Sequence, residues 1–245
     1  MRSQALVAFA TQSQQKQSSR MRTLDIEPFI LSRTEDLFIL NKPHGWPTTG
    51  RTVEDDDCIQ LHLIRYHGAM VWALHQLDAD TSGICCFTSR KDWVQPIKTL
   101  WSHPETTKEY TAVVHGRPSW QSIDVDAPIG KDPTGQLGVH PDGKDARSHF
   151  EVIDSHNDFS LLRALISTGR THQIRIHLQH LGHSLVGEEW YRSPPCNLHP
   201  RQALHASRLS LPTNPHFEQQ IYTAPLPEDL TRLMQSLKLS TLLSH

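Results

Sequence analysis

Short apolar runs of strand length, each followed by turn-forming residues, are the feature that most constrains how this chain can fold. Such runs occupy residues 37–41, 84–87, 109–115, 148–154 and 160–167. Helical periodicity occurs at residues 92–103, after residue 171 and near residue 228. Strand-length runs mixed with amphipathic segments predict an α+β domain. No run approaches the roughly 18 apolar residues of a membrane-spanning helix, so no membrane partner is expected.

The helical segments carry their own start and stop residues. Large apolar side chains at i, i+4, i+7 and i+8 predict a helix over residues 92–103, which Pro104 ends. Thr171 is the predicted N-cap of a second helix, and Gly182 is its predicted C-terminal stop. The apolar stripe of that helix consists of Ile174, Leu178 and Leu181. Residues 117–146 are rich in Pro, Gly and Asp and predict a long loop or an irregular hairpin.

The chain of 245 residues is long enough for one substantial domain, which we place at residues 25–240. Residues 1–24 hold basic side chains, a Gln- and Ser-rich stretch and no acid. This pattern is typical of a disordered polar tail, and a transit peptide or an upstream start codon are alternatives. The formal net charge of -2 shows no global basic excess, so binding to nucleic acid would depend on local patches.

The four cysteines form no CxxC pair; they are Cys58, Cys85, Cys86 and Cys196. This usage is typical of buried, reduced thiols in a cytoplasmic protein. Cys85 and Cys86 are adjacent in one apolar run, so strand geometry should point them to opposite faces of a sheet.

The segment HQLDADTSG, residues 75–83, places Asp78 and Asp80 between two apolar runs. A carboxylate in such a place can act as a nucleophile, a base or a metal ligand. The same residues also suit turn chemistry, in which Asp, Thr and Ser side chains bond to nearby backbone N–H groups. The segment alone leaves both interpretations open.

The segment STGRTHQIRIHLQHLGH spans residues 167–183 and contains a predicted helix start. Four basic residues lie close to this start: Arg170, His172, Arg175 and His177. Guanidinium groups beside a helix N-terminus suit a phosphate or a carboxylate, although a solvated basic face fits the same residues. Arg175 lies about 100° around the helix from Ile174, which lets it reach a partner at the edge of the core. The histidine spacing is not HExxH, so no metal site is predicted.

Two further segments have both a functional and a structural interpretation. In TKEYTAVVHG, residues 107–116, Tyr110 is predicted to share a strand face with Ala112 and Val114. Tyr110 is then either an active-site ring or an ordinary core tyrosine. In LNKPHGWPTTG, residues 40–50, Lys42 meets either phosphate or solvent.

In chain order, these segments resemble the motifs of RluA-type pseudouridine synthases, which isomerise uridines in ribosomal and transfer RNA. HQLDADTSG resembles H-R-L-D-x-x-T-S-G, ILNKPHGW resembles N-K-P-x-G, and TKEYTAVVHG resembles K-x-Y-x-A-x-x-x-G. Residues 168–191 resemble G-R-T-H-Q-I-R-x-H-L-x-x-L-G-H-P-I-x-G-D-x-x-Y, and LHASRLSL at residues 204–211 resembles the terminal L-H-A strand. The resemblance covers residues 33–225, so we expect a short form without the S4-type RNA-binding domain of larger relatives.

The resemblance implies the pseudouridine synthase fold: a mixed, mainly antiparallel bent sheet with a central catalytic cleft and flanking helices. Asp78 matches the catalytic aspartate, Tyr110 the tyrosine that stacks on the base, and Arg175 the arginine that pairs with the aspartate. RNA- or base-binding roles are expected for His75, Gln76, Thr81, Lys42, Arg170, His172 and Gln173. The implied enzyme acts on RNA as a monomer and needs no cofactor and no metal.

The chain departs from the family motif at Gln76, where the resemblance implies an arginine that helps to displace the base. We expect Gln76 to weaken or redirect substrate engagement while the chemistry is retained. Ser184 and Glu188 replace the usual Pro and Asp, and both look tolerable. A catalytically weak or inactive RNA-binding or RNA-chaperone protein is the main alternative, and a histidine-rich metal hydrolase is another.

Overall fold

The structure is a computed structural model that describes residues 23–50, 57–215, 218 and 220–241. Residues 1–22, which hold nearly all of the predicted tail, lie outside this part of the chain.

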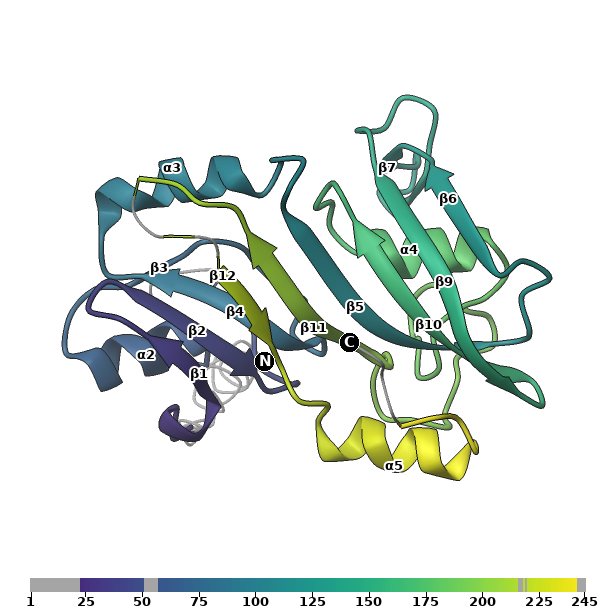
Figure 1. The fold of residues 1–245 in the computed structure, drawn as a ribbon. Coiled ribbons are helices and arrows are strands. Elements are labelled where there is room, and N and C mark those ends of the chain that lie inside the picture. Colours follow the sequence, from purple (N-terminus) through teal and green to yellow (C-terminus); the bar gives the residue numbers. More distant parts are fainter. Residues whose placement is uncertain (1–22, 51–56, 216–217, 219, 242–245) are drawn as a thin grey trace, which may run out of the picture.

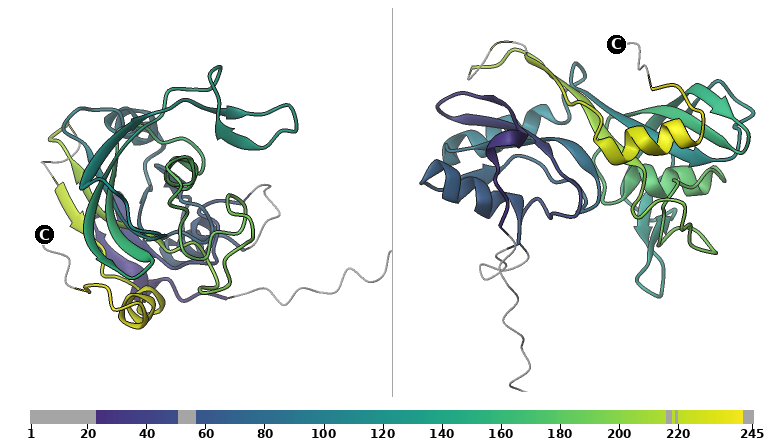
Figure 2. Two further views of the ribbon diagram at one scale, coloured as in Figure 1. Left: turned by 90° about the vertical axis from the view of Figure 1, so that its right-hand side faces the viewer. Right: turned by 90° about the horizontal axis from the view of Figure 1, so that it is seen from below.

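One half of the main sheet is built from strands near both ends of the described chain: β1 (Ile30–Arg33), β2 (Leu37–Lys42), β3 (Trp72–Ala73), β4 (Ser82–Thr88), β11 (Leu204–Leu211) and β12 (Gln220–Thr223). The other half contains β5 (Thr107–His115), β6 (Ser122–Asp126), β9 (Arg147–His156) and β10 (Phe159–Ile166). A separate hairpin projects from this half (Figure 2), formed by β7 (Ile129–Lys131) and β8 (Leu137–Val139). The helices are α2 (Ile59–His67), α3 (Lys91–Leu100), α4 (Gln173–His180), α5 (Glu228–Ser236) and the short 3-10 helix η1 (Glu27–Phe29).

The strand order of the main sheet is β1-β2-β4-β11-β5-β10-β9-β6, with β3 paired to β4 and β12 paired to β11 (Figure 1). Its strand pairs are antiparallel except for β4 and β11, which are parallel. The prediction of an α+β fold with a mixed, mainly antiparallel sheet is therefore confirmed. Within the described residues, no helix is long and apolar enough to cross a lipid bilayer.

Helices cover both faces of the sheet. Alternate residues of a strand point to opposite sides, and both sides carry apolar side chains that the helices bury. Cys85 and Ala112 belong to the cores that α2 and α4 complete, whereas Cys86 and Val113 belong to the cores that α3 and α5 complete. The two adjacent cysteines thus point to opposite faces, as predicted. Tyr110 packs against both cores on the α2 and α4 side, so its ring lies where the two halves of the sheet meet.

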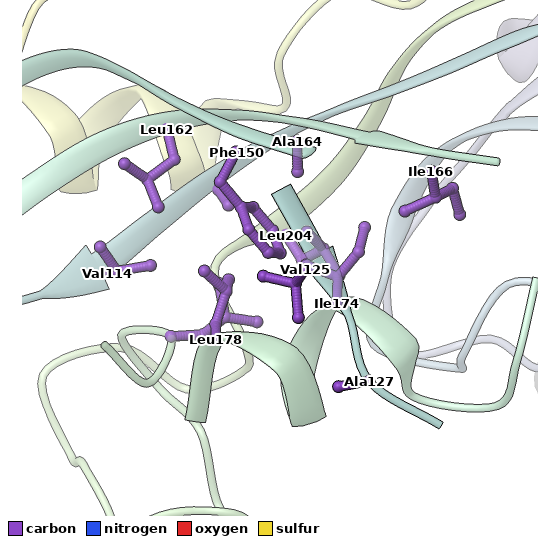
Figure 3. Close-up of a cluster of buried hydrophobic side chains, with 12 residues drawn as sticks. Val114, Val125, Ala127, Phe150, Leu162, Ala164, Ile166, Ile174, Leu178 and Leu204 are labelled. Atoms are coloured by element: carbon purple, nitrogen blue, oxygen red, sulfur yellow. The ribbon is translucent and has the colours of Figure 1, made fainter. Parts of the chain in front are cut away.

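Helix α4 packs its apolar stripe onto the second half of the sheet (Figure 3). Ile174 and Leu178 contact a cluster that includes Phe150 and Leu162, which are both fully buried. Full burial of a side chain such as Phe150 stabilises the fold by about 1.5–3 kcal/mol. This packing fixes the helix that carries the basic residues of the second motif.

The helix ends agree only in part with the predictions. Helix α3 ends at Leu100 and not at residue 103, because residues 101–103 continue only as i to i+3 turns. Gly182 ends α4 as predicted: its φ is 80°, and the amides of Gly182 and His183 donate to the carbonyls of Gln179 and Leu178. Residues 117–146, predicted as a loop or an irregular hairpin, contain the β7–β8 hairpin and also strand β6, which joins the main sheet.

The parallel pair β4–β11 brings two motifs together that are far apart in the chain. His205 pairs with Ser82, and Ala206 pairs with Gly83. Gly83 has a φ of 111°, and a Cβ atom at this position would lie 2.2 Å from the carbonyl oxygen of Ala206. Only glycine permits this approach, so the end of the Asp78 segment is anchored on a strand from the last third of the described chain.

Candidate active site

Asp78 lies in a tight turn between β3 and β4, and the backbone of this turn is held on both sides. Thr48 Oγ1 accepts a hydrogen bond from the amide of Leu77 at 3.0 Å and donates one to the carbonyl of the same residue at 3.1 Å. The amide of Thr81 donates to the carbonyl of Asp78 at 3.1 Å. The segment is therefore a turn, which agrees with the turn interpretation of the sequence. The same turn also places the Asp78 carboxylate at the cavity described below.

Two buried cations hold the next two carbonyls of the turn. Lys42 Nζ donates to the carbonyl of Ala79 at 2.8 Å, and Arg201 Nη1 donates to the carbonyl of Asp80 at 2.9 Å. Lys42 is fully buried, and burial lowers its pKa to about 8. Arg201 is anchored in turn by Asp229, in the first turn of α5, at 2.7 and 3.2 Å. The ammonium group of Lys42 is enclosed and bonded to main-chain oxygens, so in this structure Lys42 supports the turn from inside the fold, and its contact with RNA stays a prediction.

Arg175 joins two carboxylates. Its Nη1 donates to Asp78 Oδ2 at 3.1 Å, while Nε and Nη2 donate to the two carboxylate oxygens of Glu188 at 2.9 and 2.8 Å. The side chain of Arg175 is 6% exposed, that of Asp78 24% and that of Glu188 0%. Because the guanidinium fork is rigid and already held by Glu188, it fixes the direction in which Asp78 points.

Glu188 also positions the aromatic residues beside it. Its Oε1 accepts hydrogen bonds from the amides of Trp190 at 3.0 Å and Tyr191 at 3.3 Å. Burial alone would raise the pKa of Glu188, but the hydrogen bonds and charge of Arg175, with these amides, hold it below its usual value. Burial likewise opposes the charge of Arg175, and the partner carboxylates raise its pKa above the ordinary value. The pair therefore stays ionised inside the protein.

His172 lies at the N-cap of α4 with a left-handed backbone, φ 56° and ψ 21°. The predicted N-cap, Thr171, is therefore one residue too early. His172 Nδ1 is 2.7 Å from the hydroxyl of Tyr191, and its Nε2 is 3.8 Å from Asp78 Oδ1. Burial lowers the pKa of His172 and outweighs the opposing charge of Asp78, which favours the neutral ring.

Gln173 closes the first turn of α4 in place of a capping hydroxyl. Its Oε1 accepts hydrogen bonds from Thr168 Oγ1 at 2.7 Å and from the amide of Arg170 at 3.0 Å. Its Nε2 donates to the carbonyl of Arg147 at 2.8 Å and to Ser148 Oγ at 3.0 Å. The side chain is thus committed to the fold, whereas Arg170 remains exposed at the rim of the site.

These elements border a cavity of about 460 Å³, a size typical of ligand sites. Tyr110 lines the cavity with Asp78, and burial, helped by the charge of Asp78, raises the pKa of the tyrosine above its ordinary value. Apart from Lys42, every predicted site residue lines this cavity: Asp78, Tyr110, Arg175, His75, Gln76, Thr81, Arg170, His172 and Gln173. In the described part of the chain, no group of three or more His, Cys, Asp or Glu side chains is placed to hold a metal ion.

The two residues before the turn differ in their surroundings. His75 Nε2 accepts a hydrogen bond from the amide of Cys86 at 3.2 Å, and burial, helped by nearby lysines, lowers the pKa of His75 to about 3. His75 is therefore neutral and offers no positive charge to RNA. Gln76 is exposed at the cavity rim, and its Nε2 donates to Thr49 Oγ1 at 3.0 Å.

Sequence reasoning missed Arg201, Trp190 and Lys108. Lys108 lines the cavity, donates to the carbonyls of Trp101 at 2.8 Å and Ser167 at 3.2 Å, and has its pKa lowered by burial to about 8. Its place two residues before Tyr110, on the same face of the strand, was a usable signal. The sequence around Arg201 contains no comparable signal, because its partners lie in distant segments.

Comparison with known proteins places the chain in a family. Residues 36–180 match the RNA pseudouridylate synthase family. An RNA pseudouridine synthase of Bacillus subtilis, YlyB, which is itself called uncharacterized, is 33% identical over 85% of this chain and 72% of its own length. A second uncharacterized RNA pseudouridine synthase, from Chloroflexus aurantiacus, is 40% identical over 67% of this chain, and the match spans 53% of that relative.

Longer matches and solved structures agree with this. Ribosomal large subunit pseudouridine synthase D of Escherichia coli K12 is 29% identical over 91% of this chain and 74% of its own length. The structure of human RNA pseudouridylate synthase domain containing 4 superposes with a TM-score of 0.71 at 23% identity, covering 88% of this chain and 95% of that one, which supports the fold. The chain therefore belongs to the RNA pseudouridylate synthase family, a family of RNA uridine isomerases.

Proposed function

We propose that this protein converts uridine to pseudouridine in RNA at the cavity that Asp78 lines. The observation that carries the proposal is the Asp78 carboxylate held at 3.1 Å by the buried Arg175 in a cavity bordered by Tyr110. A carboxylate that works on a glycosidic bond must stay charged while a base closes over it, and a fixed guanidinium group favours that state.

The reaction needs only side-chain chemistry and positioning. Asp78 attacks C1′ of the ribose or assists removal of a ribose proton, and in either route the bond from C1′ to N1 of uracil breaks. The freed uracil turns and C1′ bonds to C5 of the base, as the bond from C1′ to Asp78 breaks in the first route and as the ribose carbon regains its proton in the second. The C5 proton is then lost while N1 regains a proton. Arg175 keeps the carboxylate in place through these steps, and the protonated Tyr110 offers its ring to the base.

The target nucleotide has to leave its stack in order to enter the cavity, at a cost of a few kcal/mol. Stacking on an aromatic face such as Tyr110 recovers about 1–3 kcal/mol of this cost. Gln76 and Arg170 lie at the rim, where an incoming strand passes. Gln76 offers hydrogen bonds to a base edge but no charge, which is the observation that favours the alternative of a weak or inactive RNA-binding protein.

We infer that residues 25–240 act as one catalytic domain on ribosomal or transfer RNA, as a monomer in the cytoplasm. The name of the Escherichia coli relative, a ribosomal large subunit enzyme, supports ribosomal RNA as the first substrate to try.

The experiment is tritium release from RNA that carries 5-tritiated uridine and comes from cells lacking this gene. Wild-type protein should release tritium, and Asp78→Asn should not. Asp80→Asn, at the exposed second carboxylate of the same turn, is the matched control and should remain active. Release by Asp78→Asn would contradict the role of this aspartate, and binding without release by the wild type would support the non-catalytic alternative.

A further inference from the structure

A second cavity of about 390 Å³ lies beside the candidate active site and has no part in the chemistry above. It is bordered by the β7–β8 hairpin, helix α4 and residues 190–193, and the hairpin and this loop project from the same side of the molecule (Figure 2). Its polar and aromatic lining includes Gln136, His140, Gln179, Trp190, Tyr191 and Arg192.

Trp190 is the distinctive residue of this cavity. Its side chain is 61% exposed although it is large and apolar, and Val139, which lines the same cavity, is 38% exposed. The ring is nevertheless held in place, because the Arg175 guanidinium lies 5.2 Å from its centre and the His172 ring meets it edge-on at 5.1 Å. A fixed aromatic ring that remains open to solvent suits a stacking partner such as a nucleobase.

Side chains in direct contact separate the two cavities. Arg175 and His172 line the first cavity, whereas Trp190 and Tyr191 line the second. The Tyr191 hydroxyl lies 2.7 Å from His172 Nδ1, and the Arg175 guanidinium lies 5.2 Å from the Tyr191 ring. The two cavities are therefore neighbours that share a wall of side chains, close enough for adjacent nucleotides of one strand to reach both.

The polar groups of the second cavity suit a nucleotide. The amides of Gln136 and Gln179 can each donate and accept hydrogen bonds at a base edge, and the Arg192 guanidinium suits a phosphate. Asp132 is the acidic residue in this lining. Its Oδ1 already accepts hydrogen bonds from Thr134 and from the amide of Gln136, so it serves the hairpin turn.

We propose that the second cavity binds the base of a nucleotide adjacent to the target uridine and stacks this base on Trp190. The inference rests on the proposed function, because the target nucleotide is taken to occupy the first cavity. His172, Trp190 and Tyr191 then stand between the two bases and keep them apart. Stacking of the neighbouring base offsets part of the cost of extracting the target, so Trp190 acts as a substrate-binding residue and not as a catalytic one.

Tryptophan fluorescence tests the contact without turnover. The full chain carrying Asp78→Asn is titrated with a single-stranded oligouridylate, and the same titration is made with Asp78→Asn/Trp190→Phe. We expect quenching in the first protein and the loss of most of it in the second, because a base stacked on Trp190 quenches that indole. Equal quenching in both proteins, or none in the first, would overturn the proposal.

Turnover separates this inference from the proposed function. Trp190→Ala should raise KM for the tritiated RNA by about tenfold, and Trp190→Phe should restore most of the affinity because it keeps a ring for stacking. Leu198→Ala is the matched control, since Leu198 is 59% exposed in the neighbouring loop but lies outside the cavity lining. Tritium release by Trp190→Ala with a wild-type KM would contradict the stacking site and leave the proposed function intact. Quenching of Trp190 without tritium release by the wild type would support the stacking site and contradict the proposed function.

Discussion

Arg201 and Asp229 share two hydrogen bonds, of 2.7 and 3.2 Å, that tie helix α5 to the turn of Asp78. The link is direct, because the same guanidinium group donates to the carbonyl of Asp80 at 2.9 Å. Arg201 is only 4% exposed, so the pair is formed in the interior, where the loss of one partner is costly. The position of the candidate catalytic carboxylate thus depends on a helix that does not line the cavity.

Arg201→Lys should therefore slow catalysis although it keeps the charge. A lysine has no fork to hold Asp229 and the carbonyl of Asp80 together, so the turn shifts, and we expect kcat to fall on the order of 10- to 100-fold with a smaller change in KM. Steady-state tritium release measures kcat and KM separately. Arg232→Lys is the control, since Arg232 is exposed on the same helix and its Nε lies 3.7 Å from Glu228 Oε1. Equal kcat values for Arg201→Lys and the wild type would refute this positioning role.

Arg175→Met should destabilise the fold as well as abolish activity. Glu188 is 0% exposed and would keep a buried charge without its guanidinium partner, so we expect a loss of about 3–5 kcal/mol in the free energy of unfolding. Arg175→Met/Glu188→Gln should recover part of the stability but none of the turnover. Urea denaturation and tritium release on the same samples test both statements. The reasoning fails if the double variant is no more stable than Arg175→Met.

The half-buried His75, neutral in the folded protein, should make stability depend on pH. Its pKa in the folded protein is about 3, below the ordinary value of 6.5, so only the unfolded chain takes up this proton as pH falls below 6.5. The stability that it contributes is fully present above pH 6.5 and is lost as pH falls toward 3. His75→Gln should remove up to about 1.4 kcal/mol per pH unit from the slope in that window. Parallel pH slopes of the two proteins in urea denaturation would contradict a neutral His75 in the folded state.

Gln76→Arg should raise activity or broaden the set of RNA targets. Gln76 is exposed at the cavity rim, where an added guanidinium group can meet a phosphate or a base without entering the core. Thr171→Arg adds the same charge at another exposed position of the rim and serves as the control. If both variants gain equally, and both gains vanish at high salt, only general attraction to RNA is at work. No effect of Gln76→Arg would count against the idea.

The periodic parts of the fold could be predicted because they follow local rules. Alternation placed Cys85 and Cys86 on opposite faces and Tyr110 beside Ala112, and a positive φ made Gly182 a helix stop. Sequence spacing alone does not show burial or long-range pairing.

The errors have the same origin. Spacing in the sequence did not show that the fold encloses the ammonium group of Lys42 among three carbonyls. Thr171 was assigned as the N-cap because hydroxyls usually fill that position, whereas His172 holds it in a left-handed conformation. Arg201 was missed since its partners, Asp80 and Asp229, lie in distant segments. Sequence analysis could not assign these residues, because only the complete sheet brings them together.

The central position of β11 has a consequence for the order in which the enzyme becomes active during synthesis. This strand lies between β4 and β5, although both are translated well before it. Until the ribosome has released residues 201–211, Gly83 is paired only with Lys42 of β2 and lacks its partner Ala206 on β11, and the carbonyl of Asp80 lacks the guanidinium group of Arg201. We expect a nascent chain that stops before this point to carry Asp78, Tyr110 and Arg175 and yet modify no RNA, including that of the ribosome making it.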